Sequence, residues 1–327
     1  MRNRGCYVAM LLGTSALLSA CGGSGGGMVA SRAGNAPADQ VLASEGSSAE
    51  VLAEGATLTA SQRTSSGITR DFEAETARLS PDTTAKVSRN ESGALTLVAG
   101  GSTIVFAPGD LSEDGYGYES EDQEAGIWAW SADSMAEQLD PTRPDASMVF
   151  DYYVNAAEGG TGRQGFLVVG TETDAATLSA LPTATYTGRS RIRVAPTTGF
   201  NSFSEDVSEA RGDLEMTANF GAGTVSGAIN RLEGRPPQAE DPTRTWSAVP
   251  GSLTLERTAI SGNGFTGAVR ADSGFTSAIG TVAAGSSYSG TFFGVGAGEV
   301  GGGLSLQGTA AETGQGYVGW GFFSGQR

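Results

Sequence analysis

The chain has 327 residues, with 20 lysines and arginines, 36 aspartates and glutamates and no histidine, and its formal net charge is −16. Such a charge argues against nucleic acid as a partner, because phosphates would be repelled. The lack of histidine removes Ser-His-Asp and Cys-His catalysis, histidine-ligated zinc and histidine-bound haem. We therefore expect no conventional enzyme and no cofactor, and we assign no residue as a metal ligand.

The first residues predict export. Arg2 and Arg4 precede an apolar stretch over residues 6–18, and small residues follow. A positive start, a short apolar stretch and small residues are typical of a secretory signal peptide, here residues 1–20. The stretch is too short to span a bilayer, which takes about 20 apolar residues.

Leu18-Ser19-Ala20-Cys21 resembles the lipobox of bacterial lipoproteins. The resemblance implies cleavage between Ala20 and Cys21 and acylation of Cys21, for instance with palmitate. By the general sorting rule for such proteins, Gly22 favours the outer membrane over inner-membrane retention. Display at the cell surface or residence in the periplasm is left open.

The cysteine count agrees with this interpretation. Cys6 lies in the signal peptide and Cys21 carries the lipid, so the mature chain has no thiol for a disulfide or a thiolate metal site. The same processing removes two arginines and leaves 18 basic residues against 36 acidic ones. Residues 21–65 are rich in glycine, serine, alanine and threonine and lack aromatics, which predicts a flexible tether.

Residues 66–180 predict a β-rich domain. The apolar runs 94–98 and 102–106 flank Gly100-Gly101 and indicate a hairpin, and residues 148–154 and 165–169 indicate two more strands. One short helix is expected over residues 131–139.

An acidic, aromatic loop follows the hairpin, over residues 110–124. The candidate contact residues are Tyr116, Tyr118, Trp128 and Trp130. Three interpretations stay open: a solvated negative loop, which we favour, a Ca²⁺ site built from carboxylates, and a surface that recognises a partner. The two tryptophans fit a core position or a ligand platform.

Residues 181–327 show the alternation of half-buried antiparallel strands. In the segment 212–220, apolar residues such as Leu214 and Met216 alternate with polar ones such as Asp213 and Glu215. About eight such segments at close spacing predict a closed eight-stranded antiparallel barrel. The polar outer face is wrong for lipid contact, so we expect a soluble barrel. Residues 232–250 hold four prolines and predict a long loop.

Three local patterns have structural interpretations. Gly262-Asn263-Gly264 predicts a hairpin turn rather than a dinucleotide site, because strands flank it on both sides. Arg211-Gly212-Asp213 opens a strand and is not taken as an adhesion motif. Arg189, Arg191 and Arg193 alternate along one strand, which predicts an outward, solvated stripe paired with acids on a neighbouring strand.

The second region resembles the C-terminal β-barrel of transferrin-binding-protein-B-like lipoproteins. Residues 181–188, 214–227 and 319–327 carry parts of the resemblance. The most specific part is Gly290-Thr291-Phe292-Phe293-Gly294-Val295-Gly296-Ala297-Gly298-Glu299-Val300-Gly301-Gly302. Residues 165–173 resemble the stretch before that barrel, which implies that residues 66–180 form the handle domain.

The sequence therefore predicts an all-β, lipid-anchored, monomeric binding lipoprotein of the outer membrane, with one handle and one eight-stranded barrel. Its partner is a protein or a small-molecule ligand of unknown identity, and the membrane is contacted through the N-terminal lipid. Two alternatives remain: an envelope structural lipoprotein without a soluble ligand, and a lipocalin-like carrier. The inward glycines of the barrel leave the carrier open, because eight strands can enclose one small ligand or only side chains.

Overall fold

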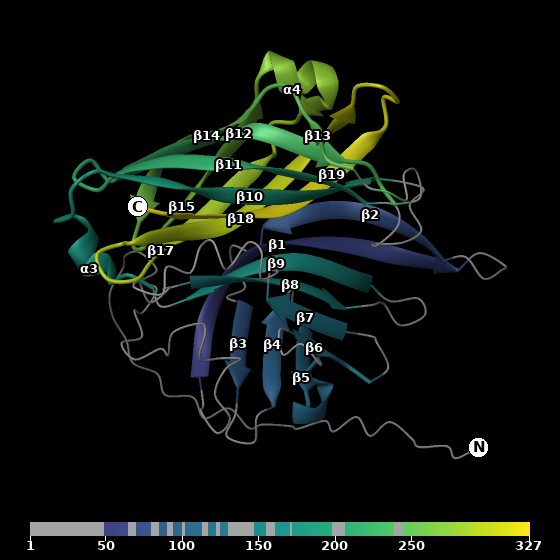
Figure 1. The fold of residues 1–327 in the computed structure, drawn as a ribbon, viewed down its shortest axis with the longest axis horizontal. Coiled ribbons are helices and arrows are strands. Elements are labelled where there is room, and N and C mark those ends of the chain that lie inside the picture. The colour runs from purple at the N-terminus through teal and green to yellow at the C-terminus, as the bar shows by residue number, and fades with distance from the viewer. Residues whose placement is uncertain are drawn as a thin grey trace, which may run out of the picture. The chain divides into compact units, whose positions relative to one another are not determined.

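The computed structural model describes residues 49–64, 70–79, 85–89, 94–99, 102–112, 117–121, 125–129, 147–154, 161–170, 172–197, 207–238, 243 and 245–327. Two antiparallel β-sheets make up most of these residues (Figure 1). Within the described ranges, no helix has the length and apolar character needed to cross a membrane.

The N-terminal sheet has nine strands. They are β1 (Ala49–Thr64), β2 (Arg70–Leu79), β3 (Ala85–Arg89), β4 (Leu95–Ala99), β5 (Ser102–Phe106), β6 (Gly117–Glu119), β7 (Ala125–Ala129), β8 (Ser147–Val154) and β9 (Thr161–Gly170). The strand order is β5-β4-β3-β1-β9-β8-β7-β6, and β2 pairs with β1 beside β3. A 3₁₀ turn, η1 (Pro108–Asp110), follows β5.

The predicted hairpin in this region is confirmed as β4 and β5, in which Leu97 pairs with Ile104. Leu95, Leu97 and Phe106 are fully buried, because alternate residues of the two strands face the same side. The two further predicted strands are β8 and β9, which pair with each other. The helix expected over residues 131–139 lies outside the described residues.

Strand pairing begins earlier in the chain than the sequence predicts. β1 lies within the segment assigned to the tether, and it pairs with β2, β3 and β9. Apolar residues such as Val51 and Leu58 are sparse in this strand. The segment therefore lacks a strong strand pattern of its own, and its partner strands determine its conformation.

The C-terminal sheet closes into the predicted eight-stranded barrel. Its strands are β10 (Ala184–Pro196), β11 (Ser208–Asn219), β12 (Thr224–Arg235), β14 (Leu253–Ser261), β15 (Gly264–Ala271), β17 (Ser287–Phe293), β18 (Glu299–Ala310) and β19 (Gly316–Gln326). The path runs β11-β10-β19-β18-β17-β15-β14-β12, and pairing of β11 with β12 closes it. Two short strands add to it: β13 (Ser247–Ala248) pairs with β12, and β16 (Gly280–Val282) pairs with β18.

Two short helices flank the barrel strands. Asp174 caps α3 (Ala175–Leu178) by accepting from the Ala176 amide at 3.0 Å. Asp272 caps α4 (Ser273–Ala278) by accepting from the Phe275 amide at 2.9 Å. Both carboxylates satisfy backbone donors that a helix leaves without an intrahelical partner.

The alternation read from the sequence is confirmed in β11, where Leu214 and Met216 are buried and Glu215 is exposed. The predicted turn joins β14 to β15 through a two-residue loop, with Ser261 paired to Gly264. Gly262 occupies it with φ +63°, a left-handed conformation that favours glycine. The loop predicted over residues 232–250 is shorter than expected, because β12 extends to Arg235 and β13 lies inside it.

Candidate functional site

The interior of the barrel is filled with side chains. Inward residues of all eight strands belong to one hydrophobic cluster. The Phe292 ring lies 5.0 Å from Phe220, 5.3 Å from Phe265 and 5.9 Å from Tyr186, measured between ring centroids. A Cβ at Gly290 would lie only 2.6 Å from the Phe265 ring. This inward glycine therefore makes room for an aromatic ring and not for a ligand.

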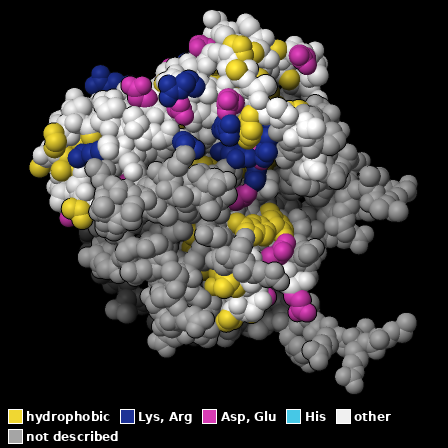
Figure 2. All heavy atoms as spheres, viewed as in Figure 1, with side chains coloured by type: hydrophobic (Ala, Val, Ile, Leu, Met, Phe, Trp, Pro, Cys, Tyr) yellow, Lys and Arg dark blue, Asp and Glu magenta, His cyan; other side chains and the backbone are white. Residues whose placement is uncertain are grey.

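The outer surface of β10, β11 and β12 is charged and concentrates arginines. We call it the arginine face and define it by the outward charged residues of the three strands: Arg189, Arg191, Arg193, Glu209, Arg211, Asp213, Glu215, Arg231, Glu233 and Arg235. Figure 2 shows basic side chains gathered in this part of the molecule. The predicted outward direction of the arginine stripe and its pairing with acids are confirmed, because Ser190 and Ile192 point inward and are buried.

One end of the arginine face is a buried ion-pair cluster around Glu209, whose side chain is only 6% exposed. Arg191 and Arg235 both donate to Oε2 of Glu209, the latter from Nε at 2.8 Å, and Arg193 reaches Oε1 at 3.5 Å. Arg193 also forms a bidentate pair with Asp151 of β8, with distances of 2.7 and 2.6 Å. The stripe is therefore not simply solvated, as the sequence suggested.

The charges in this cluster determine the protonation of Glu209. Burial by itself would raise the pKa of this carboxyl group. The nearby guanidinium groups of Arg191, Arg193 and Arg235 outweigh burial and lower the pKa to about 2. Glu209 is therefore ionised at neutral pH and holds the arginines in place.

Trp246 covers the cluster. β13 follows it directly and pairs with Glu233 and Gly234, which brings the indole over the arginine face. The guanidinium carbons of Arg211, Arg235 and Arg191 lie 4.4, 4.8 and 5.2 Å from the ring centroid. These distances are those of cation–π contacts.

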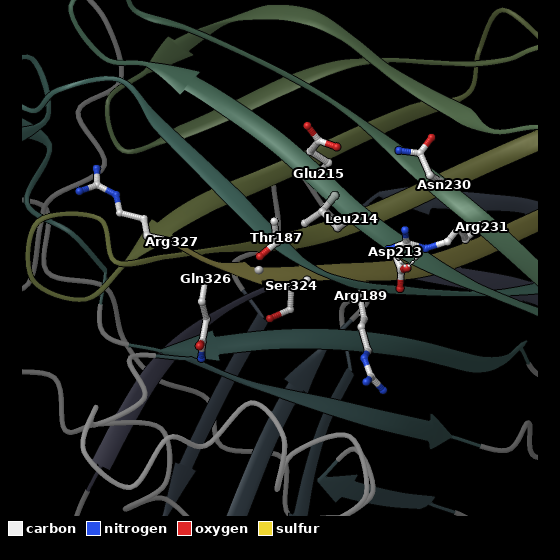
Figure 3. Close-up of a pocket in the computed structure, with 12 residues that line it drawn as sticks. Thr187, Arg189, Asp213, Leu214, Glu215, Asn230, Arg231, Ser324, Gln326 and Arg327 are labelled. Atoms are coloured by element: carbon white, nitrogen blue, oxygen red, sulfur yellow. Dashed lines mark hydrogen bonds and ion pairs between the residues drawn. The ribbon is translucent and has the colours of Figure 1, made fainter.

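The other end of the arginine face opens into a groove of about 490 Å³ (Figure 3). Its lining comes from β10, β11, β12, β19 and the C-terminal residue: Thr187, Gly188, Arg189, Asp213, Leu214, Glu215, Asn230, Arg231, Ser324, Gly325, Gln326 and Arg327. Arg231 forms an ion pair with Asp213, and their side chains are 81% and 42% exposed. Water therefore reaches this end of the face.

Arg231 faces outward only because of a β-bulge. Asp213 pairs with Asn230, but Arg211 pairs with Glu233, so that β12 has one extra residue at this point. Arg231 takes φ +48°, while Leu232 returns to the core. A left-handed conformation costs a residue with a side chain about 1–2 kcal/mol. Such strain is found preferentially at functional sites.

Of the four predicted contact residues, the structure describes Tyr118 and Trp128, and neither is fully exposed. Tyr118 is fully buried and its ring packs 6.0 Å from that of Phe106. The exposed position expected for Tyr118 is therefore corrected, because β6 pairs it with Ile127 inside the sheet. Trp128 is half-buried and stacks on Tyr153 at 5.4 Å. Tyr116, Trp130, Ala20 and Cys21 lie outside the described residues.

Among the described residues, no group of three or more acidic side chains is placed to hold a metal ion. Several members of the predicted acidic loop, including Asp114 and Glu124, lie outside the described ranges, so its interpretation as a Ca²⁺ site stays a prediction.

Residues 180–327 match a family model described as the C-lobe and N-lobe β-barrels of Tf-binding protein B. The barrel is of the transferrin-binding protein B type. The resemblance predicted from the sequence is thereby confirmed. No curated protein matches the chain.

Solved structures of transferrin-binding protein B are also similar to this chain. A variant from Haemophilus parasuis shares 14% identity with a TM-score of 0.38, over 79% of this chain and 51% of that one. The protein from serogroup B Neisseria meningitidis shares 14% identity with a TM-score of 0.37, over 79% and 58%. The chain thus spans about half the length of the first of these proteins.

The sequence pattern predicts the arginine stripe, but it does not identify Glu209, Trp246 or Arg231 as parts of the same site. A signal for the bulge was present: Ile229 and Leu232 are three residues apart in a strand that otherwise alternates every two. No local signal marks Glu209 as the carboxylate that binds the arginines, because the register of β10 against β11 and β12 determines its partners.

Proposed function

We propose that this protein is a lipid-anchored binding lipoprotein of the outer membrane that captures a protein partner on the outer surface of its barrel. The observation that carries the proposal is the packed barrel interior, in which aromatic rings meet across the space that a carrier would leave for its ligand. We therefore propose that recognition takes place on the outside of the barrel, where the arginine face and its groove lie.

The anchor rests on the sequence. Leu18-Ser19-Ala20-Cys21 follows a short apolar stretch, as in an acylated lipoprotein. Several acyl chains, at about 0.8 kcal/mol for each buried methylene, hold a protein on a membrane durably. Gly22 supports the outer membrane as the destination.

The binding role is supported by the type of the barrel, since the proteins described by the matching family model bind transferrin according to their name. The partner of this chain is a separate question, because function depends on particular sites and not on the fold. Trp246 and the exposed arginines supply residue types that are enriched in interface hot spots.

Two measurements test the proposal. Growth with an alkyne analogue of palmitate should label the wild-type chain and leave a Cys21→Ala variant unlabelled and released from the membrane fraction. The immobilised Cys21→Ala chain should then retain a specific protein from growth medium or host fluid, and excess free chain should displace it. An unlabelled wild type refutes the anchor, and retention that the heat-unfolded chain reproduces refutes specific capture.

Native mass spectrometry addresses the carrier alternative. We expect the intact chain to have the mass of the polypeptide and its lipid, with no small molecule enclosed. A bound apolar ligand that is lost only on unfolding would overturn the assignment of recognition to the outer surface.

A further inference from the structure

A second candidate surface lies on the N-terminal sheet, on β6, β7 and β8. Trp128 of β7 is opposite Gly117 of β6 and two residues from Gly126, so all three face the same side of the sheet. A Cβ atom at either glycine would overlap the indole ring of Trp128. The indole therefore lies across the two glycines, with one face against the backbone and the other directed away from the sheet.

Tyr153 of β8 extends this surface. It pairs with Gly126, and its ring is nearly parallel to that of Trp128, with 5.4 Å between centroids and 19° between planes. A Cβ atom at Gly126 would lie 2.9 Å from Cε1 of Tyr153. Both rings therefore lie close to the backbone of this glycine. Because the sheet covers the inner face of the half-buried Trp128, its exposed part belongs to the outer face and the rim.

A carboxylate without a cation borders the two rings. Glu119 of β6 is a diagonal neighbour of Trp128 on the same face and accepts a hydrogen bond from the Tyr153 hydroxyl at 2.9 Å. No lysine or arginine in the described part of the chain forms an ion pair with it. Asp151, opposite Trp128, differs because Arg193 already binds it through two hydrogen bonds. We call Glu119, Trp128 and Tyr153 the aromatic platform.

The Glu209 cluster shows which group such a combination holds. The guanidinium carbons of Arg191 and Arg235 lie 5.2 and 4.8 Å from the centroid of the Trp246 ring. Both arginines also donate hydrogen bonds to Glu209. The aromatic platform offers the same two groups, an indole and a carboxylate, and no arginine of the described ranges lies over its indole.

We infer that the aromatic platform binds an arginine side chain of a protein partner, with the guanidinium group stacked on Trp128 and paired with Glu119. The inference rests on the proposed capture of a protein partner and adds a second contact outside the barrel. A planar guanidinium group can stack on a ring and pair with a carboxylate at the same time. The ammonium group of lysine is a compact and more strongly hydrated charge, which suits this arrangement less well.

The charge of this part of the chain favours a basic segment of the partner. Residues 66–180 contain 20 acidic and 6 basic residues, whereas residues 181–327 contain 12 and 10. Figure 2 shows apolar side chains with acidic ones beside them in the lower half of the view. A positively charged segment is attracted by such a surplus of acids, whereas an anionic lipid surface is repelled.

The test uses the full chain, purified in neutral detergent, and dye-labelled twelve-residue peptides in which glycine alternates with arginine, lysine or glutamine. Fluorescence anisotropy is measured at about 0.15 M ionic strength, where distant charges are screened. The lysine peptide measures the general attraction of an acidic chain for positive charge. We expect the arginine peptide to bind at least about three-fold more tightly than the lysine peptide, because only a guanidinium group stacks and pairs at once.

A matched pair of variants locates the carboxylate. Glu119→Gln removes one negative charge and keeps an acceptor for the Tyr153 hydroxyl. Glu312→Gln makes the same change in charge at an exposed position in the turn between β18 and β19. We expect affinity for the arginine peptide to fall about five-fold in Glu119→Gln and less than about two-fold in Glu312→Gln.

Two further variants test the ring. Trp128→Leu keeps an apolar side chain over the glycines but removes the indole, so affinity for the arginine peptide should fall about five-fold. Trp128→Phe keeps a smaller aromatic ring and should lose only about two-fold, because tryptophan makes the strongest cation–π contacts. The preference for arginine over lysine should disappear in Trp128→Leu, a change that general loss of charge attraction does not produce.

Three results would overturn the inference: equal binding of the arginine and lysine peptides, equal losses in Glu119→Gln and Glu312→Gln, or an unchanged preference for arginine in Trp128→Leu. The proposed function is tested separately by capture on the wild-type chain. If Glu119→Gln and Trp128→Leu capture the same partner as the wild-type chain with equal affinity, the aromatic platform is not a contact, while the binding function stands.

Discussion

The two ends of the arginine face use the same residue types for different purposes. At the Glu209 end, three arginines form ion pairs with one carboxylate, which is almost fully buried. The Trp246 ring lies over two of these arginines, Arg191 and Arg235. At the groove end, the Arg231–Asp213 pair is open to water. Burial decides the difference: a buried charge without its partners is very costly, whereas an exposed ion pair contributes little and can exchange its partner.

The largest loss of stability is expected at the Glu209 end of the arginine face. Glu209→Gln leaves three arginines around an uncharged amide, and breaking a buried ion pair costs about 3–5 kcal/mol. We expect urea unfolding to show a loss of stability of that size. Glu233→Gln is the control, since its pair with Arg211 is about half exposed and should contribute at most about 1 kcal/mol. Equal losses in the two variants would remove the distinction between the two ends.

Lowering the pH should weaken the ion-pair cluster around Glu209 over a defined range. The pKa of Glu209 is about 2 in the folded chain against an ordinary value of 4.5, so its contribution is complete above pH 4.5 and is lost as the pH falls toward 2. The difference in unfolding free energy between the wild-type chain and Glu209→Gln should shrink over that range. A difference that stays constant down to pH 2 would show that Glu209 does not hold the cluster through its charge.

Trp246 should make an intermediate contribution. Trp246→Ala removes a ring that contacts three guanidinium groups, and partly buried cation–π contacts contribute about 1–2 kcal/mol in total. Thermal unfolding should show a loss of that order. A variant as stable as the wild-type chain would mean that the Trp246 ring does not stabilise the cluster around Glu209.

The smallest effect on stability is expected at the open end, and its sign is informative. Arg231→Gly relieves the strain at φ +48° while it removes an exposed ion pair, so stability should stay unchanged or rise by at most about 1 kcal/mol. Arg270→Gly removes a similar ion pair from an ordinary strand position and should lower stability by about 0.5–1.5 kcal/mol. Urea unfolding of both variants makes the comparison. A larger loss of stability in Arg231→Gly than in Arg270→Gly would show that Arg231 at the bulge stabilises the fold.

The N-terminal sheet shows where prediction from the sequence failed. The hairpin of β4 and β5 was predictable because Leu95 and Leu97 alternate with polar residues around a glycine turn. Tyr118 was assigned to an exposed loop because acids surround it in the sequence. It is buried because β6 pairs with β7 in a register that turns its ring into the core, and composition does not reveal that register.

The sequence by itself predicts an export signal and a lipobox-like cysteine, and it determined the closed barrel and the outward direction of the arginine stripe. Each of these depends on local order or on a period of two, which a single strand carries with it. Only the tertiary structure decided that the barrel interior is filled and that Glu209, rather than water, meets the arginines. It also decided that Arg231 faces a groove. These features depend on the register between strands distant in sequence, and a one-residue change in register reverses the direction of every side chain.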